Sequence, residues 1–359
     1  MSLNKNIFIV SGESSGDFYG FELMEKLKAH NSNISFLGMG GGEMHSLASN
    51  LLSNSDISVT GLWEAVSKFK LYVDKIKKLK RIVEYHKIDL AILIDFPGCN
   101  FRLFKILSKH KIPILYYISP QLWAWRKNRV KKIRKYVDEM CVIFPFEVDF
   151  YKKHGVGARY VGHPLVEEVQ SIELPQRRLG GIPKIGIFPG SRLNEVHRLM
   201  PTLVETICLL QKKGNFQFFL FKAPSIDREI LSFYVNDMQG VEIVERKHIS
   251  QYKDLDFALA CSGTLTFELG LLKVPMIILY KTSMFTYVVV KTFFRKIKNI
   301  GMVNIILEKP YFPELIQNQM TPQNIVGATL GFLNNNSRYK EALSHLDNFR
   351  KKWRLTSLK

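Results

Sequence analysis

The sequence is poor in the patterns that mark exported, metal-binding or membrane-spanning proteins. Its four cysteines have no paired spacing, which excludes a disulfide framework and predicts a reducing compartment; they are Cys99, Cys141, Cys208 and Cys261. No run of eighteen apolar residues is present, and the N-terminal residues lead into a predicted strand instead of a charged and then apolar leader. These absences predict a cytoplasmic protein that is neither exported nor membrane-spanning.

The signatures of common cofactor sites are missing as well. No Gly-x-Gly-x-x-Gly or Gly-Lys-Ser/Thr motif follows a predicted strand, which argues against dinucleotide and P-loop chemistry. The nine histidines show no metal-ligand spacing, and His163 is expected to be structural. Asp254 and Asp256 form an Asp-x-Asp pattern, but they precede a predicted strand and therefore belong at its entry, away from a ligand. We expect neither a metal nor a cofactor.

The composition indicates a folded, strongly basic protein. Hydrophobic residues make up 46% of the 359 residues, a length that suits two domains of ordinary size. Lysine and arginine total 51 against 32 acidic residues, which gives a formal charge of +19. Such a charge attracts phosphates, nucleic acid or an anionic membrane surface, and it does not choose among them.

Short apolar runs alternate with helical patterns, which predicts parallel sheets covered on both faces. The first half contains IFIV at residue 7, ISFLGMG at 34, LAILIDF at 90, IPILYYIS at 112, MCVIF at 140 and ARYVG at 158. After an interruption at 171–183, the pattern resumes with KIGIFPGSR, FQFFLFKAP, VEIVE, DFALACSG and VPMIILY. We predict an α/β protein with two Rossmann-like domains facing across a cleft. Their predicted bounds are 1–170 and 184–337, and the basic C-terminal helix 338–359 is expected to complete the first domain.

Two loops of the first domain carry candidate chemistry. After the first predicted strand, the small residues of SGESSGD let backbone N–H groups approach a ligand at a helix N-terminus; the candidates are Ser11, Glu13, Ser15, Gly16 and Asp17. A tight turn with Asp17 as its N-cap accounts for the same residues. Asp95 ends another buried strand, where partial desolvation favours a general base. Alternatively, its carboxylate accepts hydrogen bonds from the Pro-Gly loop that follows.

Two loops of the second domain are suited to a nucleotide. FPGSRLNEV places Arg192 at a helix start, where it can bind a phosphate through two parallel hydrogen bonds; the group comprises Gly190, Ser191, Arg192 and Glu195. A turn with an exposed arginine is the alternative. The other loop, in CSGTLTFELG, joins a strand to a helix through Ser262, Gly263 and Thr264. Glu268 follows one helical turn later, where a carboxylate can meet ribose hydroxyls.

A basic amphipathic helix is predicted over 64–86. Its apolar positions recur at helical spacing, and its opposite face carries five basic residues: Lys75, Lys77, Lys78, Lys80 and Arg81. A docked helix with a solvated face explains this pattern, and attraction to an anionic membrane explains it too.

The order of these pieces resembles the lipid-A-disaccharide synthase family along nearly the whole chain. The resemblance rests on SGESSGD, GMGGGEMHS, VTGLWEAV, IDFPGCNFRL, the block around SPQLWAWR, FYKKHGVGARYVGHPL, FPGSRLNEV, SGTLTFELGLLKVPMIILYK and GMVNIILEKPYFPELIQNQMTP. It implies a glycosyltransferase-B fold with an N-terminal acceptor domain, a C-terminal UDP-sugar domain and no essential metal. One departure is Gly98, which replaces an acid that is frequent in the family after the proline of the IDxP motif.

The resemblance also implies a reaction and a set of site residues. The enzyme would condense UDP-2,3-diacylglucosamine with 2,3-diacylglucosamine 1-phosphate to the β-1,6-linked lipid A disaccharide 1-phosphate and UDP, by inverting displacement. Asp95 would be the base, Arg192 and Asn304 match residues needed for activity, and Ser262 to Glu268 match the nucleotide loop. An apolar patch would contact lipid, although core burial competes as its explanation; its members are Val59, Leu62, Trp63, Val66 and Phe69. We expect peripheral attachment to the cytoplasmic face of the inner membrane. Whether the protein forms a homodimer is left open by the resemblance.

Two kinds of rival function remain at this point. The first is another UDP-sugar enzyme of the same fold, such as the peptidoglycan N-acetylglucosaminyltransferase or a UDP-N-acetylglucosamine 2-epimerase. The second is a basic nucleic-acid-binding protein, but the sequence contains no recognisable nucleic-acid module. SPQLWAWR and the apolar patch favour the lipid enzyme, so we expect no nucleic-acid partner.

Overall fold

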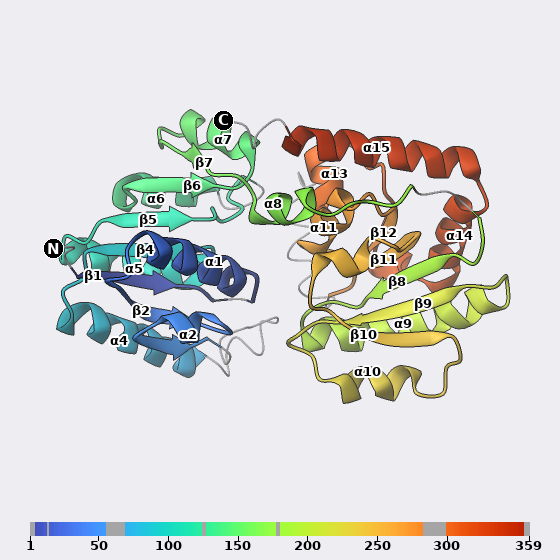
Figure 1. The fold of residues 1–359 in the computed structure, drawn as a ribbon, viewed down its shortest axis with the longest axis horizontal. Coiled ribbons are helices and arrows are strands. Elements are labelled where there is room, and N and C mark those ends of the chain that lie inside the picture. The colour runs from blue at the N-terminus through green and yellow to red at the C-terminus, as the bar shows by residue number, and fades with distance from the viewer. Residues whose placement is uncertain are drawn as a thin grey trace. The chain divides into compact units, whose positions relative to one another are not determined.

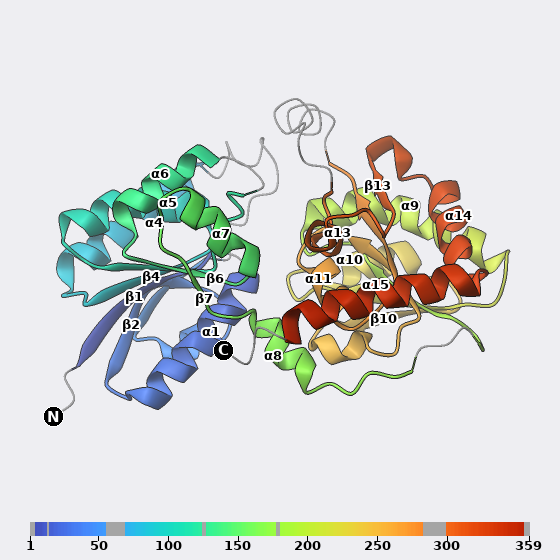
Figure 2. The ribbon, with the colours of Figure 1, turned by 90° about the horizontal axis from the view of Figure 1, so that it is seen from above.

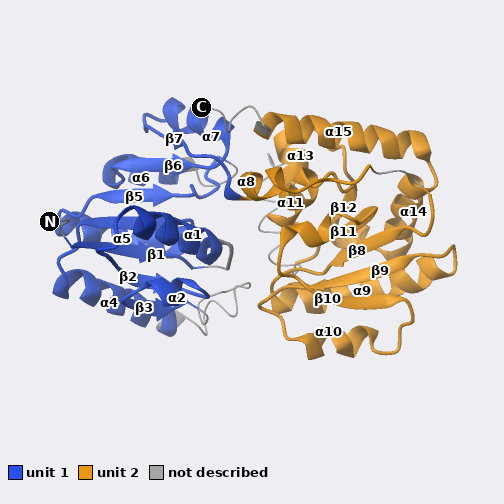
Figure 3. Cartoon of the chain, viewed as in Figure 1, with its two compact units in different colours: residues 1–164 blue, residues 165–359 orange. Residues whose placement is uncertain are grey.

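The computed structural model describes residues 4–12, 14–54, 69–123, 127–176, 180–282 and 299–354. It divides into two compact units, residues 1–164 and 165–359, which are coloured separately in Figure 3. Each unit is an α/β domain built on a parallel sheet, as the alternating pattern predicts.

The first unit contains a seven-stranded parallel sheet within the described residues, in the order β3-β2-β1-β4-β5-β6-β7 (Figure 1). The strands are β1 Lys5–Val10, β2 Ile34–Gly40, β3 Asn50–Ser53, β4 Leu90–Ile94, β5 Ile114–Tyr117, β6 Glu139–Val142 and β7 Arg159–Tyr160. The central strands are buried on both faces, which explains why they read as continuous apolar runs. The edge strand β3 was not predicted, because NLLS is short and only half-buried.

Helices cover both faces of this first sheet. Their bounds are α1 Ser14–His30, α2 Met44–Leu47, α4 Phe69–Tyr85, α5 Pro97–Lys109, η1 Lys127–Arg129, α6 Val130–Tyr136 and α7 Pro145–Lys153. Helices α4, α5, α6 and α7 lie on one face, and α1 lies on the other (Figure 2). The core between α4, α5 and the sheet is formed by buried apolar side chains that include Phe8, Leu79, Leu93 and Leu103.

The second unit repeats the architecture with a six-stranded parallel sheet in its described part, in the order β10-β9-β8-β11-β12-β13. The strands are β8 Lys184–Phe188, β9 Gln217–Lys222, β10 Val241–Glu245, β11 Phe257–Cys261, β12 Met276–Tyr280 and β13 Glu314–Ile316. The helical elements are α8 Pro164–Gln170, which begins at the boundary between the units, α9 Leu193–Gln211, α10 Arg228–Val235, η2 Ile249–Tyr252, α11 Leu265–Leu271, α13 Met302–Leu307, η3 Gln317–Gln319, α14 Pro322–Leu333 and α15 Asn336–Arg354.

The division into units differs in two respects from the predicted domains. The boundary lies at residues 164 and 165, so that α8 belongs mostly to the second unit, whereas the prediction ended the first domain at residue 170. Helix α15 packs against α11, α13 and α14 of the second unit, although the prediction used it to complete the first domain. Phe349 and Trp353 of α15 are buried against Phe267, and this apolar contact fixes α15 on the second unit.

Candidate functional site

The topology of each sheet selects one place for a ligand. In the first sheet the strand order reverses between β1 and β4, and in the second it reverses between β8 and β11. Open parallel sheets bind ligands beyond the carboxyl ends of the strands at such a reversal. The four loops that follow these strands are the four that the sequence analysis selected: 11–17, 95–98, 189–192 and 262–264.

Asp95 directly follows β4 and has an unusual backbone conformation. Asp95 and Phe96 both have positive φ angles, 40° and 38°, which is rare for residues other than glycine. The Asp95 N–H donates to the carbonyl oxygens of Tyr117 and Ile118, both at 3.2 Å. Its own carbonyl accepts from the Tyr116 hydroxyl at 2.5 Å and from Asn100 Nδ2 at 2.6 Å. These contacts hold the strained turn and fix the half-buried Asp95 at the carboxyl edge of the sheet.

The Phe96 ring lies against the loop after β1. A Cβ atom at Gly12 would lie 2.2 Å from the Phe96 ring, so a residue without a side chain is required there. This contact brings the turn after β4 and the loop after β1 together. It explains, in part, why the loop after β1 is rich in small residues.

Asp17 links the loop after β1 to the ends of the neighbouring strands. Its carboxylate accepts from the Gly41 N–H at 3.1 Å and from Asn54 Nδ2 at 2.7 Å. Burial raises the pKa of Asp17, while the Ser11 hydroxyl and the Asn54 and Gly41 donors act in the opposite direction. Gly16 packs on the Ser11 hydroxyl, 2.6 Å from where its Cβ would be. The structure thus brings Ser11, Gly16 and Asp17 together. Asp17 holds the start of α1 to the residues that follow β2 and β3.

Two other members of this predicted group are not placed by their side chains. Glu13 lies outside the described residues, and Ser15 is described only as part of the α1 backbone. Their assignment to the acceptor side stays a prediction.

The loop after β8 gathers its four predicted residues around one carboxylate. Glu195, in the first turn of α9, accepts from the Ser191 N–H and from Arg192 Nη1, each at 3.2 Å. Gly190 has φ +113°, and a Cβ on it would lie 2.5 Å from Glu195 Oε2. The backbone therefore folds tightly around an anionic group at a helix N-terminus, where the helix dipole favours negative charge. Such a loop is chemically suited to a phosphate.

The loop after β11 is open, and its glycine is conformationally required. Gly263 has φ +145°, and a Cβ there would meet no atom within 4 Å. Ser262 Oγ donates to the Ile300 carbonyl at 2.9 Å, while Gly263 and Thr264 are exposed. Exposed backbone at the start of α11 leaves room for a ligand.

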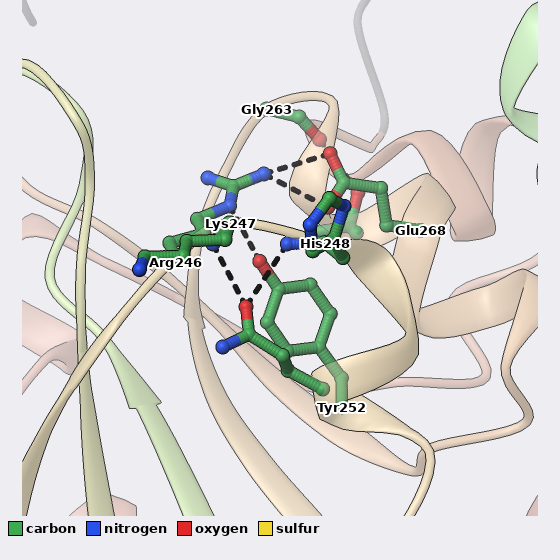
Figure 4. A network of polar contacts seen from close by, with 8 residues as sticks. Arg246, Lys247, His248, Tyr252, Gly263 and Glu268 are labelled. Atoms are coloured by element: carbon green, nitrogen blue, oxygen red, sulfur yellow. Dashed lines mark hydrogen bonds and ion pairs between the residues drawn. The ribbon is translucent and has the colours of Figure 1, made fainter.

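Glu268 forms a buried ion pair that the sequence analysis did not anticipate (Figure 4). Arg246 Nη2 lies 2.8 Å from both Glu268 carboxylate oxygens, and Arg246 Nε donates to the Tyr252 hydroxyl at 2.7 Å. Burial lowers the pKa of Arg246, but Glu268 and Tyr252 together more than offset this, so the guanidinium stays charged. Gly263 lies beside the pair in Figure 4, so the pair borders the open loop.

Asn304 is buried inside the second unit. It is 0% exposed, and its Nδ2 donates to the Phe312 carbonyl at 2.8 Å and to Glu314 Oε1 at 2.9 Å. Its Oδ1 accepts from the Phe312 N–H at 3.1 Å. The amide thus holds α13 against the loop before β13, and its assignment as a catalytic residue stays a prediction.

Sequence reasoning missed one buried carboxylate, Glu147 on α7. It is 1% exposed, and burial raises its pKa to about 7. The signal was its place just after a predicted strand, in FPFE. His163, by contrast, is buried, which lowers its pKa to about 3, and its ring packs against Tyr19 and Phe144; its structural role stays a prediction.

Several other predictions concern surfaces. Val59, Leu62, Trp63 and Val66 of the apolar patch lie outside the described residues, as does the Phe69 side chain. Helix α4 is amphipathic as predicted, with Leu79, Ile82 and Val83 buried. Lys75, which was predicted on the solvated basic face, is instead buried, and its Nζ donates to the Ser53 carbonyl at 2.6 Å. Among the described residues, no helix is both long and apolar enough to cross a membrane, and no cluster of three metal-ligating side chains occurs.

The Asp-x-Asp pattern lies where the sequence placed it, at a strand entry. Asp256 Oδ2 accepts from the Lys184 N–H at 2.8 Å, and the Asp256 carbonyl accepts from the Tyr339 hydroxyl at 2.8 Å. Asp256 therefore ties the amino ends of β8 and β11 to α15, at the edge opposite the candidate ligand loops.

Comparison with known proteins gives evidence on the family as well as on the fold. A family model described as lipid-A-disaccharide synthetase matches residues 7–359. The lipid-A-disaccharide synthase of Trichlorobacter lovleyi is 38% identical over 95% of this chain and 92% of its own length. That of Coxiella burnetii is 33% identical over 97% and 94%.

Solved structures with 10–14% identity show the fold alone. A UDP complex of MnaA from S. aureus gives a TM-score of 0.63 at 11% identity, over 96% of this chain and 91% of that one. Acinetobacter baumannii MurG gives a TM-score of 0.54 at 14% identity, over 97% of this chain and 95% of that one.

Proposed function

The chain belongs to the lipid-A-disaccharide synthase family and is a glycosyltransferase of lipid A biosynthesis, and we propose that its first unit binds the acceptor and its second unit the UDP-sugar. The donor is UDP-2,3-diacylglucosamine, and the acceptor is 2,3-diacylglucosamine 1-phosphate. The observation that carries this division is the position of the four candidate loops at the two strand-order reversals.

The reaction is an inverting displacement. The acceptor 6-hydroxyl oxygen forms a bond to the donor's anomeric carbon, and the bond from that carbon to the diphosphate breaks on the opposite face. The hydroxyl proton passes to a base, and the bonding electrons leave with UDP. The products are the β-1,6-linked disaccharide 1-phosphate and UDP.

We assign Asp95 as the base. Its strained turn is held by Tyr116 and Asn100, so the carboxylate is presented from a rigid strand end. Burial and then the charge of Asp95 raise the pKa of the Tyr116 hydroxyl, which therefore stays protonated and continues to donate. Rigid placement matters because displacing a reacting group by about 1 Å can cost 100-fold in rate.

The second unit stabilises the leaving group. Arg192 and the Ser191 N–H already bind a carboxylate at the start of α9, and a diphosphate would take these donors in its place. Glu268, held by Arg246 beside the open loop at Gly263, is the acceptor for ribose hydroxyls. Asn304 acts from a distance, by fixing α13.

The basic surface, defined as the exposed lysines and arginines of α4, α5 and α6, is proposed to bind the anionic cytoplasmic face of the inner membrane. Asp74 and Glu84 are the acidic residues of these three helices, against Lys77, Lys78, Lys80, Arg81, Arg102, Lys105, Lys109, Lys131, Lys132, Arg134 and Lys135. The three helices lie on one face of the sheet (Figure 2). Binding to phosphatidylglycerol vesicles should be lost at roughly 0.5 M salt, and binding that survives such salt would contradict a charge-driven attachment.

The proposed chemistry is tested with Asp95→Asn. Disaccharide formation should fall by at least about 100-fold while UDP binding, measured by calorimetry, is unchanged. Asp89→Asn is the matched control, because Asp89 lies just before the amino end of the same strand, paired with Lys5. Near-normal turnover of Asp95→Asn would remove it as the base.

The lipid specificity has its own test. The donor should be used much better with its acyl chains than without them. Comparable turnover of the deacylated UDP-glucosamine donor would contradict a lipid A enzyme and favour another UDP-sugar transferase.

A further inference from the structure

The two carboxylate oxygens of Glu147 accept hydrogen bonds from different parts of the first unit. Oε2 accepts from the Phe144 N–H at 3.1 Å, which caps the start of α7. Oε1 accepts from Ser119 Oγ at 2.7 Å and from Trp123 Nε1 at 3.2 Å. Ser119 and Trp123 belong to the 118–123 loop after β5, so the carboxylate joins this loop to α7.

Helix capping alone does not explain this arrangement. A cap needs one oxygen and is normally exposed, whereas Glu147 is 1% exposed. Tyr151, one turn further along α7 and 0% exposed, donates from its hydroxyl to Ser119 Oγ at 3.1 Å. Two side chains of α7 thus converge on one serine of the neighbouring loop. Burying a carboxylate is costly, which indicates that the position of this loop matters.

The 118–123 loop is in direct contact with the Asp95 turn. Ile118 has a positive φ of 63°, and its carbonyl accepts from the Asp95 N–H at 3.2 Å. The Ile118 N–H donates in turn to the Cys141 carbonyl of β6 at 3.1 Å. Three strained residues, Asp95, Phe96 and Ile118, therefore depend on neighbouring strand ends to keep their conformation.

We propose that Glu147 is a positioning residue for the glycosyl transfer, which fixes the 118–123 loop through Ser119 and Trp123 and, through Ile118, the backbone of Asp95. The proposal rests on the proposed function, because it takes Asp95 as the reacting group. Glu147 itself acts through other residues. It is buried beneath the loop and binds no substrate.

The carboxylate is suited to this task in a way that an amide is not. Each of its oxygens accepts, so it serves Phe144 on one side and Ser119 and Trp123 on the other. A glutamine has a single acceptor oxygen and must give up one side. Glu147→Gln is therefore expected to lose either the cap or the link to the loop, and Glu147→Ala loses both.

The test compares Glu147→Gln with Ser119→Ala, which removes the Ser119 bond to Glu147 and leaves the Trp123 bond and the cap intact. Each should lower kcat by about 10- to 100-fold and change the KM for the UDP-sugar by no more than about twofold. The double variant should be no slower than the slower single variant, because both changes weaken the same link. The Trp123 indole N–H resonance, assigned with Trp123→Phe, should shift in Glu147→Gln. Glu139→Gln is the control, because Glu139 is a half-exposed glutamate at the other end of β6, and it should leave kcat unchanged.

The outcomes separate this inference from the proposed function. Loss of thermal stability with unchanged kcat in both variants would show that Glu147 is only structural and would overturn the inference. Should Glu147→Gln fail to fold, Ser119→Ala decides alone by the same criterion. If Asp95→Asn is inactive while both variants turn over normally, the base assignment stands and the positioning role fails. If Asp95→Asn is active, the base assignment fails first.

Discussion

Glu268→Gln should destabilise the second unit by an amount that the geometry of its ion pair predicts. In the native protein one guanidinium nitrogen of Arg246 lies 2.8 Å from both carboxylate oxygens. The side chains of Arg246 and Glu268 are 25% and 9% exposed, so water replaces little of what the substitution removes. The glutamine keeps one acceptor for Arg246 and loses the charge.

The expected magnitude follows from the state in which Arg246 is left. Removing one partner of a buried pair costs about 3–5 kcal/mol, because the other charge stays buried without compensation. Arg246 keeps its hydrogen bond to Tyr252 and the neutral acceptor of the glutamine, which places the cost at about 2–3 kcal/mol. For a unit of this size, such a loss lowers Tm by roughly 5–10 °C.

Trp353 provides the assay. It is the tryptophan of the second unit, it is 2% exposed, and its ring packs on Phe267, the neighbour of Glu268 in α11. Its emission, in a background where the other three tryptophans are phenylalanine, follows the unfolding of that unit in urea. The same substitution should also weaken UDP binding if Glu268 binds ribose.

A second background makes the prediction refutable. In Arg246→Met, Glu268 is a buried carboxylate without its cation, so Glu268→Gln should be neutral or stabilising there. An equal cost of Glu268→Gln in both backgrounds would refute the reasoning, since the ion pair could not then be its source. An unchanged midpoint in the native background would refute it as well.

Three further expectations concern other parts of the chain. Gly190→Ala should destabilise by about 1–3 kcal/mol and weaken UDP binding, because its φ is +113° and the new Cβ would meet the Glu195 carboxylate, whereas Gly157→Ala, which meets nothing within 4 Å, should change neither. Burial raises the pKa of Glu147 from 4.5 to about 7, so the folded protein holds a proton that the unfolded chain releases in this range. Its contribution to the free energy of unfolding should therefore fall by about 3 kcal/mol as pH rises from 4.5 to 7, and urea titrations should show that Glu147→Gln removes this fall. Asn304→Leu should lower stability by about 2–4 kcal/mol, because buried backbone groups lose their partners, and a Tm within 1 °C of the native value would contradict this structural role.

Local pattern was enough to predict the elements of the fold. The run ISFLGMG forms β2 at residues 34–40, and KIGIF forms β8 at 184–188, because strands buried on both faces must be apolar throughout. The helix predicted over 64–86 is observed as α4 at 69–85, within the part of that range that the structure describes. The candidate loops were found for a related reason, since small residues are needed where a strand turns sharply into a helix.

The sequence did not predict which groups the buried polar side chains would bond to. Arg246 meets Glu268 across 22 residues, and Glu147 meets Ser119 across 28, with no periodicity to connect them. Asn304 matched a family motif, yet only packing showed that its amide is bonded within the protein. The attachment of α15 was equally undetermined, because a basic helix with one apolar stripe can pack on either unit.

By itself, then, the sequence determined which segments are strands, where the loops at their carboxyl ends lie and which family the chain resembles. These are properties of short stretches, in which the neighbouring residues in the sequence are enough to predict each residue's burial and backbone preference. Three features were decided only by the tertiary structure. They are the strand order that places 95–98 beside 11–17, the ion pair of Glu268 with Arg246, and the hydrogen bonds by which Glu147 joins α7 to the 118–123 loop. Those depend on which distant groups become neighbours when water is excluded, and a buried charge acquires its partner and its pKa only then.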